Sequence, residues 1–216
     1  MKLYNSLGPN PRLVRMFLLE KGIELPLEEL DIMAGENRQE SYLSKNPYGE
    51  VPSLELDDGQ VISETVTICE YLEELNPEPA LVGASPAARA NTRMWLRRVE
   101  LHVTAPLTDA FRSGAGQAMF KDRRHLVPHA AEDWAQIAQE GMAVLDAQLT
   151  GREFIAGDAF TLADVFAYCL LDFGGGVGQP IGADNANLLA WFERIGSRPS
   201  AEASLHPVAA AGGMRA

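Results

Sequence analysis

The chain has 216 residues, 46% of them hydrophobic, and a formal net charge of −12. This length accommodates one large domain or two small ones, and the absence of an 18-residue apolar run excludes a membrane-spanning helix. Residues 1–80 hold 16 Asp and Glu against 6 Lys and Arg, a balance of −10 that leaves only −2 for the rest. A surface with this excess of negative charge repels a phosphate-rich polymer. We therefore expect no binding of nucleic acid.

The ends and the cysteines indicate a cytoplasmic protein. The N-terminus lacks an apolar segment followed by a small-residue cleavage site, which argues against secretion. The two cysteines, Cys69 and Cys169, both lie in apolar helical contexts. A disulfide framework needs more cysteines and an oxidising compartment, so we expect reduced thiols in the cytoplasm.

Short strands alternate with helices over the first 75 residues. The helix that starts near Leu13 is predicted from apolar residues at helical spacing, and Gly22 ends it. The turn Asp57-Asp58-Gly59 joins two strands as a hairpin. The order predicts a small mixed sheet with helices. The predicted elements are a strand over 2–5, a helix over 13–21, a strand over 26–30, a helical turn near 40–44, strands over 51–56 and 61–63, and a helix over 64–74.

The rest of the chain is helical in pattern. Asn76-Pro77-Glu78-Pro79 breaks the preceding pattern, so we predict an α/β domain over 1–76, a linker over 77–86 and an all-helical domain over 87–216. The glycine-rich stretch 174–178 is expected to be an interhelical loop. Long helices are predicted over 87–112, with a kink at Pro106, and over 124–149, 161–173 and 186–196.

The turn Gly8-Pro9-Asn10-Pro11 is a candidate binding site. Ligands of open α/β layers gather beyond the carboxyl ends of strands, near the N-termini of helices. Asn10 lies at the start of the first helix, where its side chain either caps that helix ahead of Pro11 or faces a ligand. Both interpretations stand on the sequence.

Two further turns could present a backbone to a ligand. Pro52 opens a strand, and a cis bond before it would leave the Val51 backbone free to pair with an extended peptide. At Glu64-Thr65 a helix begins. The amides there and the Thr65 hydroxyl could receive a carboxylate, while Glu64 could hold an ammonium group. Capping is the alternative interpretation for this second pair.

A folding motif and the histidines complete the survey. Thr161 and Asp164 have the spacing of a capping box, flanked by Phe160 and Val165 at the positions of a hydrophobic staple. This pattern serves stability rather than catalysis. The four histidines form no cluster with metal-ligand spacing, so we expect no metal site.

The order of these pieces resembles the soluble glutathione transferase family over essentially the whole chain. This resemblance implies a thioredoxin-like N-terminal domain, an all-helical C-terminal domain and a homodimer. It also implies a cis bond before Pro52. The stretches that carry it are LYNSLGPNPRLVRMFLLEKGI, NPYGEVPSLELDDGQVISETVTICEYLEE, FIAGDAFTLADVFAY and WFERIGSRPS.

The resemblance also assigns glutathione-binding residues. By motif position, Val51 before Pro52 pairs with the cysteinyl part of glutathione, Glu64 and Thr65 hold the γ-glutamyl amine and carboxylate, and Asn37 is expected at the glycyl end.

The expected thiol activator departs from the best-known classes. Their catalytic Tyr, Ser or Cys has no clear counterpart, and Gly8 stands where a hydroxyl residue is common. The Pro9-Asn10 step resembles the bacterial nu-class enzymes, in which an asparagine amide approaches the sulfur of glutathione. Asn10 is therefore the expected activator, with Ser6 as the fallback.

The expected activity follows from the same resemblance. Family geometry implies an electrophile pocket against the first long helix, with Trp95, His102, Phe111 and Arg112 as candidates, although each could instead belong to the helix core or the dimer surface. We expect conjugation of glutathione, as co-substrate, to small electrophiles in detoxification. Glutathione-dependent reduction of disulfides or peroxides is the enzymatic alternative. A non-catalytic binding or assembly module is the alternative of a different class.

Overall fold

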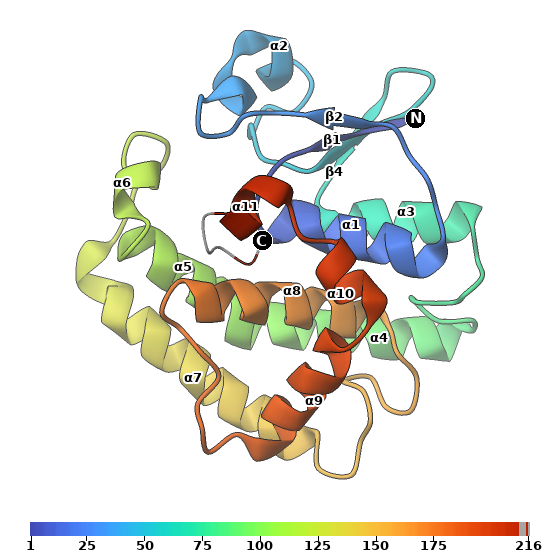
Figure 1. Cartoon of the computed structure of the whole chain (residues 1–216), viewed down its shortest axis with the longest axis vertical. Helices are drawn as coiled ribbons and strands as arrows, with labels where there is room; N and C mark the ends of the chain where they lie inside the picture. The colour runs from blue at the N-terminus through green and yellow to red at the C-terminus, as the bar shows by residue number, and fades with distance from the viewer. Residues whose placement is uncertain (212–214, 216) are drawn as a thin grey trace.

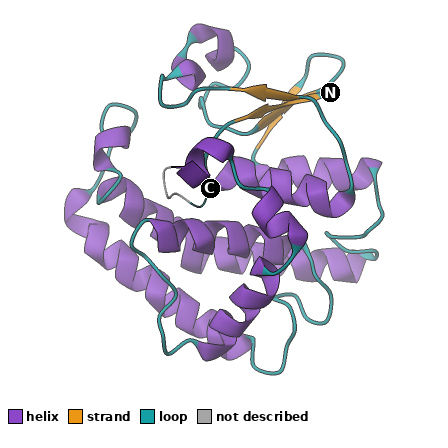
Figure 2. Cartoon of the chain, viewed as in Figure 1, coloured by secondary structure: helices purple, strands orange, loops and turns teal. Residues whose placement is uncertain are grey.

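A computed structural model describes residues 1–211 and 215. It confirms the predicted fold class, a small α/β domain of thioredoxin-like order followed by an all-helical domain (Figure 2). The last residues of the predicted domain 87–216, which are 212–214 and 216, lie outside the described residues.

The N-terminal sheet has the strand order β2-β1-β3-β4. Strand β1 runs parallel to β2 and antiparallel to β3, and β3 pairs with β4 as the predicted hairpin. In this register Leu3 lies opposite both Leu27 and Leu54, and Leu3 and Leu54 are fully buried. The strands are β1 (Lys2–Asn5), β2 (Leu27–Glu29), β3 (Ser53–Glu55) and β4 (Val61–Ser63).

Helices α1 (Pro9–Lys21) and α3 (Thr65–Leu75) lie side by side on the sheet face that meets the C-terminal domain (Figure 1). Gly22 ends α1 in the left-handed conformation, at φ 64, which only glycine adopts freely. The other face carries the short turns η1 (Glu36–Arg38) and α2 (Glu40–Leu43).

In the C-terminal domain, α8 is the central helix. All its residues from Leu162 to Gly174 are buried, and it contacts α1, α4 and α9 (Figure 1). The helical segments of this domain are α4 (Pro86–Val99), the π-helical η2 (Glu100–Thr104), α5 (Ala105–Ser113), α6 (Gln117–Phe120), η3 (Pro128–Ala130), α7 (Ala131–Gln148), α8 (Leu162–Gly176), α9 (Ala186–Gly196), α10 (Pro199–Ala203) and α11 (Pro207–Ala211).

The kink predicted at Pro106 takes the form of the π turn η2, just before that residue. Proline has no N–H for the carbonyl of His102, four residues earlier, and its ring would clash with that carbonyl, so the helix widens there. Helix α7 lies against the turn: a Cβ on its Gly141 would stand 1.9 Å from the His102 oxygen. A glycine is therefore required at this crossing.

Two helix boundaries differ from the sequence prediction. The helix expected over 124–149 begins only at Ala131, because Pro128 heads a separate 3₁₀ turn. The loop expected at 174–178 is wrong in its first half, since α8 continues through Gly176. Gly174 stays helical because a neighbour packs closely on it: a Cβ there would lie 2.7 Å from Leu107 Cδ1.

Two ion pairs, one buried and one partly buried, join the two domains at α1. Arg12 is fully buried, and its guanidinium donates to Asp172 of α8 at 2.7 Å and to the carbonyl of Ala201 in α10 at 2.9 Å. Near the other end of α1, Glu20 accepts hydrogen bonds from Arg198 at 2.8 and 2.6 Å. Neither contact has a local signal along the chain. Together they fix α1 against the helical domain.

The connection between the domains is fixed as well. Residues 76–85 contain no helix or strand. The buried carboxylate of Glu73 accepts from Lys21 Nζ at 2.8 Å and from the backbone N–H groups of Leu81 and Val82 at 3.2 and 2.8 Å. This carboxylate thus ties the connection to α1 and α3.

The predicted capping box at the start of α8 is confirmed. Asp164 is fully buried, and its carboxylate accepts the backbone N–H groups of Ile155 and Thr161 and the indole N–H of Trp191, each at 2.9 Å. Burial raises the pKa of Asp164, and these hydrogen bonds oppose that rise. One side chain thus joins α8, α9 and the preceding loop.

Replacing Asp164→Ala is expected to lower the free energy of unfolding by roughly 3 kcal/mol or more, because several buried donors lose their acceptor. Urea denaturation followed by circular dichroism measures the change. The control is Asp158→Ala in the same loop, an exposed site where a change within about 0.5 kcal/mol is expected. Equal losses in the two variants would contradict the assigned role of Asp164.

Candidate functional site

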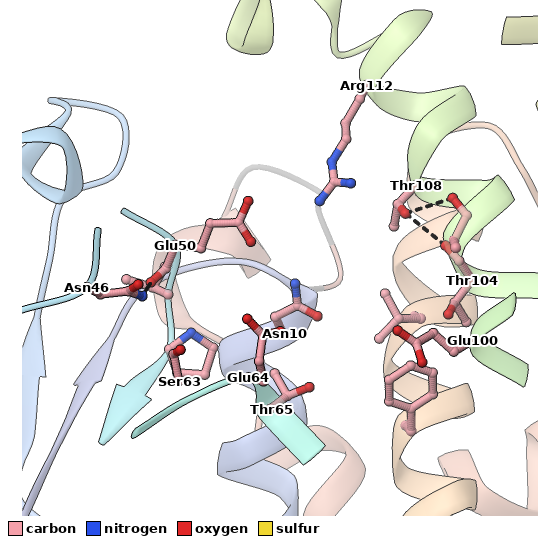
Figure 3. Close-up of a pocket in the computed structure, with 15 residues that line it drawn as sticks. Asn10, Asn46, Glu50, Ser63, Glu64, Thr65, Glu100, Thr104, Thr108 and Arg112 are labelled. Carbon is pink, nitrogen blue, oxygen red and sulfur yellow. Dashed lines mark hydrogen bonds between the residues drawn. The ribbon is translucent and has the colours of Figure 1, made fainter. Parts of the chain in front are cut away.

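A cleft of ≈ 220 Å³ lies between the two domains, and polar side chains line most of it (Figure 3). Strand ends and helix starts of the N-terminal domain form one wall, and η2 and α5, with two residues of α8, form the other. Asn10 lies between the two walls, on the first turn of α1.

The first wall contains the bond between Val51 and Pro52, which is cis, as the resemblance implied. Val51 precedes β3 and takes no part in the ladders of that strand. The loop before it is held by Tyr42 and Asn46, which both donate to the carbonyl of Glu50 at 2.8 Å. The Val51 backbone is therefore presented to the cleft in a fixed position.

The same wall continues to the start of α3. Glu64 has φ 70 and ψ 120, and it is the one non-glycine residue with positive φ in the described part of the chain. Its exposed side chain makes no capping hydrogen bond, so the capping interpretation is wrong for Glu64. Strain of this kind is concentrated at functional sites. The turn presents the Glu64 carboxylate and the N-terminus of α3 to the cleft, with Thr65 and Ser63 beside them.

The opposite wall is a polar stripe of four residues, each four positions from the next: Glu100, Thr104, Thr108 and Arg112 (Figure 3). Thr108 donates to the carbonyl of Thr104 at 2.9 Å. In a regular α-helix such a stripe rotates steadily around the axis. A π turn holds more residues than an α turn, so the one at the start of the stripe delays this rotation and keeps the four residues on the cleft side.

A second cavity of ≈ 150 Å³ adjoins the cleft and is lined largely by apolar side chains, among them Leu7, Ile32, Phe111 and Phe173. Residues of both domains line cleft and cavity together, so the two spaces are continuous. These shared residues are Asn10, Glu50, Val51, Thr108 and Arg112. Asn10 thus stands where a polar space meets an apolar one.

The environment of Asn10 separates the two interpretations of this residue. Helix α1 begins at Pro9, so Asn10 lies inside the first turn rather than before it, and no side chain caps this helix. Pro9 and Pro11 have no N–H, and that of Arg12 donates to Gly8 O at 3.1 Å. The backbone and side-chain amides of Asn10 are therefore the donors that the first turn offers.

Three other predicted site residues lie elsewhere. Ser6 is 2% exposed, donates its hydroxyl to the carbonyl of Leu30 at 2.6 Å and lines neither the cleft nor the apolar cavity. Trp95 and His102 line a different cavity, of ≈ 530 Å³, between α4 and α7. Trp95 and His102 therefore line neither the cleft nor the apolar cavity beside it.

Asn37 and the remaining candidates do reach the site. Asn37 lines the apolar cavity and is 4% exposed. Its Nδ2 donates to Gly49 O at 2.6 Å, while its buried Oδ1 has no partner among the described residues. Phe111 and Arg112 line the same cavity, and their contact with an electrophile stays a prediction. Burial, and next the charge of Arg124, lower the pKa of Arg112.

Several lining residues escaped the sequence interpretation. Polar residues at every fourth position from Glu100 to Arg112 are a signal that the sequence contains and that the candidate list of Trp95, His102, Phe111 and Arg112 uses only at its last residue. By contrast, Met119, Phe120 and Arg123 lie in a short, irregular segment where no period marks an inward side.

Comparison with known proteins decides the family. The sequence models described as "Glutathione S-transferase, N-terminal domain" and "Glutathione S-transferase, C-terminal domain" match residues 3–80 and 132–199. The chain belongs to the glutathione S-transferase family. The prediction of a glutathione transferase is thereby confirmed, and family membership supports glutathione as its co-substrate.

Individual relatives of this transferase match over most of its length. "Glutathione S-transferase 2" of Saccharomyces cerevisiae is 31% identical over 207 residues, which cover 89% of this chain and 84% of the relative. A glutathione S-transferase domain-containing protein of Marinobacter aquaeolei has a crystal structure with a TM-score of 0.87 and 38% identity, covering 93% of this chain and 99% of the other. The crystal structure of Gtt2 from Saccharomyces cerevisiae has a TM-score of 0.87 and 30% identity, covering 95% of this chain and 100% of the other.

The described residues of this transferase offer neither a metal site nor a membrane span. They contain no group of three or more His, Cys, Asp or Glu placed to hold a metal ion. None of the helices they form combines the length and apolar character that crossing a membrane requires.

Replacing Glu64 tests whether its strained backbone serves the site. Both Glu64→Gly and Glu64→Ala remove the carboxylate, so both are expected to weaken glutathione binding in calorimetry. Only glycine adopts a positive φ without strain. The free energy of unfolding of Glu64→Gly is therefore expected to exceed that of Glu64→Ala by about 1 kcal/mol. If both variants bound glutathione as strongly as the wild type, the strained turn at Glu64 would have no role in binding.

Proposed function

We propose that this transferase conjugates the thiolate of glutathione to small electrophiles. The observation that supports this most directly is the position of Asn10, where the polar cleft opens into the apolar cavity. A peptide thiol held there would meet an apolar second substrate within one continuous space.

Glutathione would lie as an extended peptide along the first wall. Its cysteinyl part pairs with the Val51 backbone, and its γ-glutamyl carboxylate meets the N-terminus of α3 at Thr65, with the ammonium group near Glu64. At the glycyl end, the unpartnered Oδ1 of Asn37 suits the peptide N–H, and neighbouring Arg38 offers its charge to the terminal carboxylate. These local donors allow an acidic domain to bind an anion.

The thiol would be held as a thiolate by the amides of Asn10. A free thiol has a pKa of about 8.5, and lowering it by about two units requires roughly 2.7 kcal/mol. A hydrogen bond to a charged group contributes roughly 1.5–3 kcal/mol. The side chain and backbone amide of Asn10 therefore suffice together, and no general base is needed.

Replacing Asn10→Ala is expected to raise the pKa of the bound thiol by about one unit and to lower kcat/KM at neutral pH about tenfold, because one of two donors is lost. Ultraviolet absorbance of the thiolate against pH and turnover of an aryl halide measure the two effects. The matched control is Ser6→Ala, whose hydroxyl binds backbone outside the cleft. Unchanged values in Asn10→Ala would remove this assignment.

The same variant addresses the alternatives. A thiolate held at Asn10 could also reduce a disulfide or peroxide, so the assay includes a disulfide beside the aryl halide. Both cysteines are fully buried, so neither of them would form a mixed disulfide with glutathione. Binding of glutathione with no turnover of any substrate would favour the non-catalytic module.

We also propose that the transferase is a cytoplasmic homodimer. Exposed apolar side chains lie on α4, η2 and α7, and two of them, Ile137 and Val144, line the cavity where Trp95 and His102 lie. They are Met94 (40% exposed), Leu101 (47%), Ile137 (41%) and Val144 (65%). An apolar face of this kind marks an interaction site, and a second copy of the chain would cover it.

Replacing Val144→Glu is expected to convert the dimer to a monomer, because a charge would be buried in the interface. Light scattering measures the mass. The control is Val208→Glu on α11, at a side chain that is 63% exposed and outside the lining of this cavity. A monomeric wild type would overturn the proposed dimer.

A further inference from the structure

The floor of the apolar cavity is aromatic. Phe111 stands edge-on to Phe120, with 6.0 Å between the ring centroids, and edge-on to Phe173, at 5.0 Å. All three rings line the cavity. Its volume of ≈ 150 Å³ is that of a space able to hold one benzene ring. The floor therefore suits a small aromatic body.

Arginine side chains stand over this floor. The guanidinium carbons of Arg112, from α5, and of Arg123, which follows α6, each lie 5.9 Å from the centroid of the Phe120 ring. Arg38 from η1 lines the same cavity. Three cations from different segments thus converge on a space whose other walls are largely apolar.

The positive charge of the cavity is not balanced by its lining. Glu50 is the one acidic residue among the described residues that line it. Arg112 contacts Asp109, on the next helical turn, at 3.5 Å. The like charges of Arg123 and Arg124 lower the pKa of Arg38, after its burial, and that of Arg124 lowers the pKa of Arg112. In a chain of net charge −12, this concentration of cations indicates an anionic ligand.

We propose that the electrophile is an aromatic carboxylate, with its ring on the phenylalanine floor and its carboxylate bound by Arg112 and Arg123. This inference rests on the proposed transferase function. Arg38 is left to the glycyl end of glutathione, so the second substrate needs its own cations. The second substrate also needs these cations because the thiolate beside Asn10 would otherwise repel its carboxylate. A guanidinium matches a carboxylate in shape as well as charge.

Product analogues test the inference without depending on turnover. S-(4-carboxybenzyl)glutathione and S-(4-carbamoylbenzyl)glutathione have nearly the same shape and differ in one charge. Calorimetry with the wild type is expected to show about tenfold tighter binding of the carboxylate. Arg112→Gln or Arg123→Gln should bring the ratio of the two affinities close to one, whereas Arg112→Lys should retain part of it.

The matched control is Lys121→Gln, which removes a positive charge two positions from Arg123 at an exposed site outside the cavity lining. Lys121→Gln should keep the tenfold ratio of affinities, because Lys121 does not reach the bound carboxylate. If the ratio depended only on the overall charge of this region, Lys121→Gln would lower it as much as Arg123→Gln. Loss of the ratio in the control, or equal binding of both conjugates by the wild type, would overturn the inference while leaving the transferase function intact. Failure to bind either conjugate would instead overturn the proposed function.

A turnover arm uses 4-(bromomethyl)benzoate and 4-(bromomethyl)benzamide. In each the glutathione sulfur attacks the benzylic carbon, a C–S bond forms, the C–Br bond breaks and bromide leaves. The wild type is expected to have a KM about tenfold lower for the benzoate, and Arg112→Gln should remove that difference. A KM independent of the carboxylate in the wild type would contradict the assigned substrate class.

Discussion

The buried ion pair between Arg12 and Asp172 determines where the site lies. Helix α1 belongs to the sheet domain, yet this pair fixes it to α8, the central helix of the other domain. The candidate thiol-binding residue, Asn10, lies on the first turn of α1, two residues before Arg12. Removing two charges from water is costly, so such a pair is stable only when further hydrogen bonds satisfy it, as Ala201 does here. The relative position of the cleft walls follows from this contact.

The fold was largely predictable because its signals are local. Helical spacing and Gly22 defined α1, the Asp57-Asp58-Gly59 turn defined the hairpin, and Thr161 with Asp164 defined the start of α8. The errors arose where distant residues decide local structure. Gly174 is helical because Leu107, 67 positions away along the chain, packs against it, and no pattern within the stretch 174–178 records that contact.

The site, like the fold, was predictable where local motifs define it and not where distant packing does. Val51 and Glu64 lie at turns that a motif identifies, and the structure brings both to the cleft with Asn10. The opposite wall depends on which face of a long helix meets the sheet domain. Two stripes were available on that helix, and the choice between Trp95 and Thr104 is made by packing on α7 and α8 rather than by composition. A buried network such as that of Arg12 likewise has no signature along the chain.

The crossing of α7 over the π turn has a mechanical consequence. Since Gly141 packs against the carbonyl of His102, the segment from Glu100 to Arg112 is held against α7 near its Glu100 end. A side chain at position 141 would push this end of the segment away from α7 and displace the wall of the cleft that Glu100 and Thr104 form. Selectivity for glutathione and for the electrophile would therefore change through substitution of side chains along this segment, and not through movement of its backbone.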